Sequence, residues 1–173
     1  MNSKYSRLAV IFHWVIAMAI LVMFPLGFYM ADLPLSPRKL QLYSYHKWIG
    51  VSVFALVWLR LLWRRFNQPP ALPTHYPQHI VVLSKLGHAG LYFFMIVVPI
   101  SGWLMSSALG FQTVWLGVVP LPDLVARDKE LADVLMNVHL YLNIAFLVLI
   151  TGHVLAALKH HFIDKDPFLN RMS

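Results

Sequence analysis

Four long apolar segments dominate the 173-residue sequence and limit the folds open to it. They cover about residues 8–31, 40–63, 81–109 and 134–158. A helix needs about 20 apolar residues to cross a hydrocarbon core of about 30 Å, and each segment is long enough. With 59% hydrophobic residues and a mean hydropathy of +0.64, the chain is too apolar for an ordinary soluble domain. We therefore predict one domain over 1–173, an all-α integral membrane four-helix bundle whose helices run up, down, up and down.

The distribution of charge predicts the orientation of this bundle. If the N-terminus is cytoplasmic, nine of the 14 lysines and arginines flank the cytoplasmic ends of the helices. The other five fall outside: Arg38, Lys39, Lys47, Arg127 and Lys129. Because cytoplasmic flanks of membrane helices are enriched in cations, we expect both termini in the cytoplasm. The same rule accounts for the net charge of +7 without invoking nucleic acid.

Several classes of protein are disfavoured by what the sequence lacks. There is no cysteine, which excludes disulfides, thiolate metal sites, iron–sulfur clusters and covalently attached haem. No acidic residue falls within a predicted span, so a transporter or channel has no intramembrane acids to line its pathway. The first apolar segment exceeds the core of a signal peptide and lacks a convincing cleavage site, so we expect it to remain as a helix.

Two histidines interrupt the last apolar segment. His139 and His153 lie fourteen residues apart, which corresponds to a rise of about 21 Å and a rotation about 40° short of four turns. They therefore share one helix face near opposite ends of the hydrocarbon core. Each can ligate a separate cofactor.

Two other spans supply histidines at matching depths. His13 lies near the cytoplasmic end of the first span, and His46 lies near the outer end of the second. The depth pairs are His13 with His153 and His46 with His139. Any one of these histidines alone is explained by hydrogen bonding across helices or by contact with interfacial water. The four together favour bis-histidine ligation of two b-type haems, because polar side chains inside a membrane usually mark function.

Small residues and one arginine accompany these histidines. A flat macrocycle needs small neighbours on the helices beside it, although close helix packing explains the same residues equally well. The small residues at matching positions are Ala17, Gly27, Gly50, Gly102 and Ala157. Arg60 lies fourteen residues after His46, at the depth of the inner pair, and is a candidate partner for a haem propionate.

The remaining histidines are assigned less directly. His88 lies close to Lys85 and competes with His13 or His153 as an inner ligand, but we place it near the inner haem or in a quinone site instead. His160 and His161 follow Lys159 at the cytoplasmic interface, where a solvated helix end explains them. His75 and His79 belong to a proline-rich stretch and are expected to be ordinary loop residues.

Four segments together resemble the bacterial cytochrome b561 family. They are KYSRLAVIFHW at the start, LRLLWRRF at the end of the second span, LGHAGLYFFMIVVPISGWLM in the third, and GHVLAALKHHFIDKDPFLNRM near the C-terminus. The resemblance covers essentially the whole chain. It implies a multi-pass, four-helix cytochrome of the bacterial inner membrane that carries two haem b groups and exchanges electrons with ubiquinone.

The resemblance also assigns roles to individual residues. The family places the two haem ligands of its fourth helix fourteen residues apart, which His139 and His153 match. By the same resemblance His46 completes the outer haem, His13 completes the inner haem, and His160 lies near the quinone with Lys159 beside it. No catalytic residue is assigned.

The resemblance leaves two functions open. The first is an oxidoreductase in its own right, which passes electrons from an outer donor, superoxide, through both haems to ubiquinone. The alternative is a cytochrome b anchor subunit, which relays electrons between quinone and a peripheral dehydrogenase or hydrogenase. The short loops and termini offer little docking surface and favour the first. In both, the partners are membrane lipid and ubiquinone, and no nucleic acid.

Overall fold

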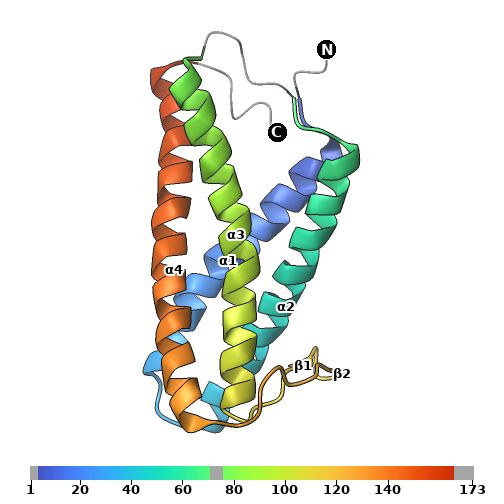
Figure 1. The fold of residues 1–173 in the computed structure, drawn as a ribbon, viewed down its shortest axis with the longest axis vertical. Coiled ribbons are helices and arrows are strands. Elements are labelled where there is room, and N and C mark those ends of the chain that lie inside the picture. The colour runs from blue at the N-terminus through green and yellow to red at the C-terminus, as the bar shows by residue number, and fades with distance from the viewer. Residues whose placement is uncertain (1–3, 71–75, 166–173) are drawn as a thin grey trace.

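Four long helices form the protein in a computed structural model that describes residues 4–70 and 76–165. The helices are α1 (Arg7–Asp32), α2 (Pro37–Phe66), α3 (Gln78–Ala108) and α4 (Lys129–Leu158), and a π-helical turn, η1 (Lys159–Ile163), continues α4. Successive helices run in opposite directions along the bundle (Figure 1). The four helices predicted from the apolar segments are confirmed.

The helices are longer than the apolar segments because capping residues, rather than hydropathy, determine where they begin. Side chains of Ser6, Ser36 and Asp128 accept hydrogen bonds from the first-turn backbone N–H groups of α1, α2 and α4. As a result α4 begins at Lys129, ahead of the predicted 134. α3 begins at Gln78, ahead of the predicted 81, and follows Pro77 without a side-chain cap.

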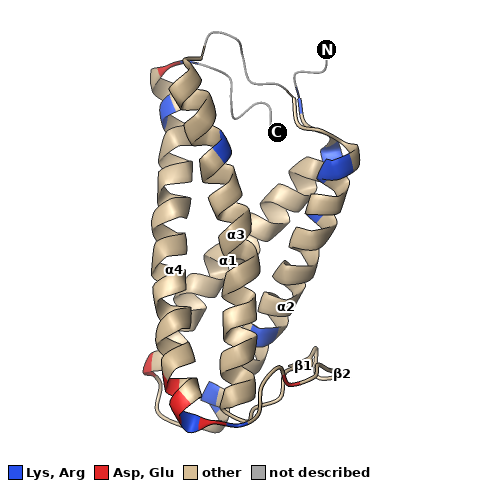
Figure 2. Ribbon diagram, viewed as in Figure 1, with Lys and Arg blue, Asp and Glu red and all other residues tan. Residues whose placement is uncertain are grey.

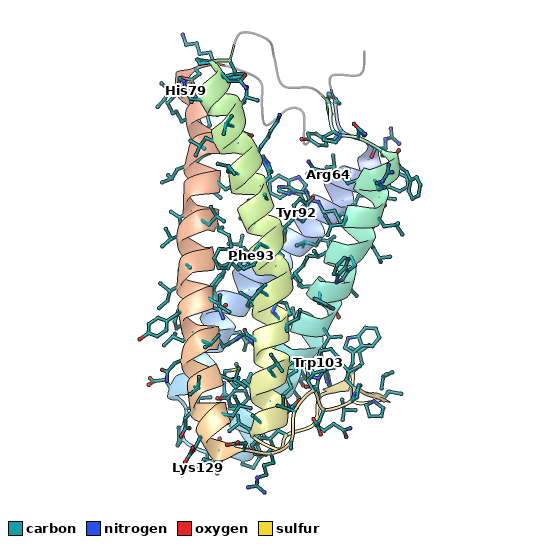
Figure 3. All side chains as sticks on the ribbon, in the orientation of Figure 1. Arg64, His79, Tyr92, Phe93, Trp103 and Lys129 are labelled. Carbon is teal, nitrogen blue, oxygen red and sulfur yellow. The ribbon has the colours of Figure 1, made fainter. Side chains whose placement is uncertain are left out.

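The early start of α3 changes the place of His79. His79 was expected in a loop, but it lies in the first turn of α3, at the end of the bundle where the figure labels it (Figure 3). The helix extends past the apolar run into the polar residues that precede it. His75, the other histidine of that stretch, lies outside the described residues.

Three of the helices are long and apolar enough to cross a membrane: α1, α3, and α4 together with η1. α2 is not among them, although it has 30 residues. Its apolar run over 40–63 is interrupted by two cations, Lys47 and Arg60, and by uncharged polar residues such as Gln41, Ser44 and His46. The fourth predicted span therefore stays a prediction, while the other three helices have the length and composition of membrane spans. Most charged side chains lie toward the two ends of the bundle (Figure 2).

The helices pack mainly in two pairs, α1 with α2 and α3 with α4, and α2 also contacts α3. The buried core lies midway along the bundle, where Phe146 of α4 packs between Phe24 and Phe94. Most large apolar side chains elsewhere on the helices face outward, including Val148 in the middle of α4, which is 68% exposed. Such a surface suits lipid better than water.

The connection between α3 and α4 contains an element that the sequence did not predict. Strands β1 (Val114–Trp115) and β2 (Val119–Pro120) pair in antiparallel fashion beside α2 (Figure 1). This small hairpin is the one departure from an all-α fold among the described residues.

Candidate functional site

The structure brings His46 and His139 to one cavity near the α3–α4 connection. Its volume is about 570 Å³, within the range of cofactor pockets, and mostly apolar side chains line it. Gly50, Gly102 and Lys47 also contribute to its wall. The outer pair proposed from depth along the helices thus shares a cavity large enough for a flat cofactor.

The His139 ring is held by α3. Its Nδ1 lies 2.8 Å from Oγ of Ser101, and that hydroxyl donates its hydrogen to the Val98 carbonyl at 2.7 Å. Since the hydroxyl has only one hydrogen, it accepts from Nδ1–H of His139. This arrangement leaves Nε2 as the ring nitrogen with a lone pair, which is the tautomer a metal ligand requires.

A glycine lies beside each ring of this pair, and only the one beside His139 is in a place too tight for an ordinary Cβ contact. A Cβ placed on Gly102 would lie 3.1 Å from Cε1 of His139, and one on Gly27 would lie 3.5 Å from Cε1 of His46. Nδ1 of His46 is buried, and no hydrogen bond to it is found among the described residues. All four helices therefore contribute to the outer site, α1 and α3 through glycine and α2 and α4 through histidine.

At the other end of the bundle, His13 and His153 face each other. Their ring centroids are 6.4 Å apart. Two imidazoles on opposite sides of one iron, each with a metal–nitrogen bond of about 2.0 Å, place their centroids about 6.3 Å apart. The observed separation therefore fits a pair of axial ligands.

His88 lies in the same cluster but fits that role poorly. Its ring centroid is 5.5 Å from that of His153, which is too short for two ligands on opposite sides of one iron. Its Nδ1–H donates to the Ser84 carbonyl one turn earlier, at 2.6 Å. The centroid distances thus favour His13 over His88 as the partner of His153, in line with the pairing predicted from depth.

Arg60 lies beside this inner pair. Its Nη1 is 3.3 Å from Nδ1 of His13, longer than the usual 2.9–3.0 Å for an N–H donor. Arg60 and Arg64 both lie over the ring of Tyr92, with each guanidinium carbon 5.6 Å from its centroid. Figure 3 labels Arg64 and Tyr92 at this level of the bundle. Two arginines here can pair with a carboxylate more strongly than with a neutral ring.

Beyond the last turn of α4, one carboxylate ties together the residues assigned to the quinone. Nζ of Lys159 lies 2.8 Å from Oδ2 of Asp164, and Nδ1–H of His160 donates to the same oxygen at 2.7 Å. The hydrogen bond from Lys159, with that from His160, holds the pKa of the Asp164 carboxyl below its usual range. Tyr76 packs edge-on against the His160 ring.

Two of these residues were not found by sequence reasoning. Asp164 carries a detectable signal, since it lies four residues after His160 in the sequence. Ser101 carries none, because its role depends on α3 meeting α4. The residues that the sequence assigned to the inner end do lie toward the end of the bundle that holds His13 and His153. They are Arg60, His88, Lys159 and His160.

Known proteins are similar to this chain over nearly its whole length. A family model described as "Prokaryotic cytochrome b561" matches residues 4–173. The chain is 34% identical over 171 residues to "Cytochrome b561 homolog 2" of Escherichia coli (strain K12), covering 98% of this chain and 90% of that protein. It is 31% identical over 181 residues to "Probable superoxide oxidase CybB" of Yersinia pestis, covering 99% and 97%.

A further relative, "Cytochrome b561 homolog 1" of Escherichia coli (strain K12), is 28% identical over 181 residues, covering 98% of this chain and 97% of that protein. These matches extend over nearly the whole length of each protein, as the resemblance in the four sequence segments did. The chain belongs to the prokaryotic cytochrome b561 family.

Proposed function

We propose that the protein is a dihaem membrane cytochrome that oxidises superoxide at its outer end and reduces ubiquinone at its inner end. Two superoxide anions each lose one electron and become dioxygen. The two electrons and two protons convert one ubiquinone to ubiquinol. The observation that carries this proposal is the 570 Å³ cavity that holds His46 and His139, with Lys47 in its wall.

Two pairs of histidines would hold the haems, His46 with His139 and His13 with His153. Family membership implies b-type haem, and bound haem iron supplies one-electron chemistry between ferrous and ferric states. The shared cavity supports the first pair, and the 6.4 Å centroid separation supports the second. Ser101 fixes the tautomer of His139, and Arg60, which lies beside His13, would bind a propionate carboxylate.

The outer cavity suits an anionic donor. Outer acids balance outer cations by number, so the net charge of that face does not attract superoxide. The structure supplies a local cation instead, because Lys47 lines the cavity next to His46 in the sequence. A positive side chain in a low-dielectric wall attracts a small anion over short range.

The inner end suits quinone reduction, which consumes protons. His88, Lys159 and His160 carry exchangeable protons near the His13–His153 pair and the end of α4. Asp164 accepts from Nδ1–H of His160, which orients the ring so that Nε2 exchanges the proton. We propose that this end faces the cytoplasm of a bacterium, with both termini on that side of the inner membrane.

The test of this function is direct reduction of the purified protein by superoxide. We expect the haem α-band to appear rapidly in stopped-flow mixing, without another protein, and to disappear when ubiquinone is added. Superoxide dismutase should abolish the reduction. Lys47→Gln should slow it several-fold, whereas Lys129→Gln, which removes an exposed outer cation, should leave the rate nearly unchanged. Slow reduction by superoxide together with copurification of a peripheral dehydrogenase would instead establish the anchor-subunit function.

Ser101 is a positioning residue, because it acts on the proposed haem ligand His139 through a hydrogen bond. Donation from Nδ1–H to its hydroxyl makes His139 a more basic ligand, which favours ferric iron. Ser101→Ala should therefore keep the full haem content but raise the midpoint potential of one haem by roughly 20–60 mV, the equivalent of about one weak hydrogen bond. Redox titration of the two haems measures this shift.

The matched control is Ser107→Ala, which removes another buried hydroxyl of α3 that donates to the Trp103 carbonyl. It should leave both potentials unchanged. If Ser101→Ala also left them unchanged, the hydrogen bond to His139 would have no influence on the iron.

A further inference from the structure

The hairpin between α3 and α4 has a composition that is unusual for a water-exposed loop. Residues 114–122 read VWLGVVPLP, without a single charged or hydrogen-bonding side chain other than the tryptophan indole. Turns that face water are usually built from glycine and proline, whose backbone conformations suit a turn, and from asparagine, aspartate and serine, whose side chains bond to the backbone or to solvent. This segment has glycine and proline but otherwise only apolar residues.

The apolar side chains at the tip of the hairpin are exposed. Val118 is 78% exposed, Leu116 is 53% exposed and Val119 is 44% exposed. Leu116 also adopts a φ of +53°, a left-handed conformation that glycine or asparagine adopts with less strain. Turn geometry therefore does not explain a leucine here, and neither does burial inside the protein.

Three indoles fix the hairpin at one level of the bundle. Trp48 Nε1 donates to the Val114 carbonyl at 2.7 Å, Trp115 Nε1 donates to Ser52 Oγ at 3.1 Å, and Trp103 Nε1 donates to the Pro122 carbonyl at 3.0 Å. Tryptophan is enriched at the two interfaces between membrane and water. Such a cluster therefore marks where the bilayer surface crosses the protein.

The hairpin points sideways rather than along the bundle. It extends outward past α2, at about the height of the labelled Trp103, and does not pass the end of α4 (Figures 1 and 3). In a membrane protein, a projection to the side at the level of an indole cluster meets lipid. A projection along the helix axes would meet water.

We propose that this hairpin is a membrane-interface anchor, whose tip residues Leu116, Val118 and Val119 insert into the boundary between lipid headgroups and acyl chains. The backbone of a hairpin is tolerated there because headgroups and water satisfy its polar groups. The flanking residues Thr113 and Leu121 line the outer cavity, so lipid contact at the tip holds the wall of that cavity in place.

The absence of cysteine from the chain allows a clean test with single nitroxide labels. Val118→Cys probes the tip. Val148→Cys, on the exposed middle of α4, is the lipid standard, and Ala126→Cys, an exposed residue of the same connection, is the water standard. Each labelled holoprotein is reconstituted in phosphatidylcholine vesicles, and power-saturation EPR measures collision with oxygen, which concentrates in lipid, and with a water-soluble nickel chelate.

We expect the ratio of oxygen to nickel accessibility at Val118 to be several-fold above that at Ala126 and below that at Val148. A ratio equal to that at Ala126 would place the tip in water and overturn the proposal. Low accessibility to both reagents would also overturn it, because the tip would then be buried against a second copy of the chain or another protein. An unchanged haem spectrum confirms that each labelled variant is folded.

Discussion

His139→Ala is expected to reduce the haem content of the purified protein by about half, because under the proposed assignment it removes one ligand of one haem and leaves the other pair intact. The His139 ring is held by a hydrogen bond with Ser101, and it lies close to Gly102, where an added Cβ would crowd it. Alanine cannot replace its Nε2. The measurement is the haem-to-protein ratio from the pyridine haemochrome assay, together with the optical spectrum of the reduced protein.

The matched control is His88→Ala. His88 lies 5.5 Å from His153 by ring centroids, a distance that does not suit the opposite side of the same iron. The control variant should therefore keep its full haem content. Loss of haem from His88→Ala together with full content in His139→Ala would overturn the ligand assignment. A wild-type protein with a single haem would overturn the dihaem proposal as a whole.

Gly102→Leu is expected to have the second largest effect. A Cβ at this position would already lie 3.1 Å from Cε1 of His139, closer than most side-chain contacts in proteins. A leucine adds three more carbons into the cavity that Gly102 lines. The ring of His139 must then turn away, and overpacking of this kind typically costs about 1–3 kcal/mol. We expect loss of about half the haem, as in His139→Ala, with the helical content unchanged by circular dichroism.

Gly87→Leu provides the control on the same helix. A Cβ at Gly87 would meet nothing within 4 Å, so the larger side chain has room, and replacing glycine inside a helix favours the helix by up to about 1 kcal/mol. Its haem content should match that of the wild type. If both leucine variants lost haem equally, the effect would come from α3 in general and not from crowding of His139.

Hydropathy and cap chemistry explain why the fold was largely predictable. The four apolar segments each became a helix, because an apolar run of about 20 residues has no other way to satisfy its backbone inside lipid. The helix ends were less predictable, since serine and aspartate caps extend α2 and α4 into polar sequence. The hairpin was missed because its strands have only two residues each, too few to show alternation.

The candidate site was likewise predictable only in part. Helical spacing alone placed His139 and His153 on one face of α4 and matched each with a histidine of similar depth. Depth predicted His13 as the partner of His153 and put His88 at a shallower level, but it could not exclude His88 as a ligand. That choice depends on where α1 and α3 approach α4, and the centroid distances of 6.4 Å and 5.5 Å reflect that packing.

What the sequence by itself determined is the apolar character of the chain, the four helices and the position of each paired histidine along its own helix, since all three follow from local periodicity and hydropathy. What only the tertiary structure decided is which groups touch: Ser101 with His139, Gly27 with His46, and the hairpin with α2. The physical reason is that rise and rotation per residue are fixed within one helix, whereas the distance between helices depends on how side chains from different parts of the chain pack together.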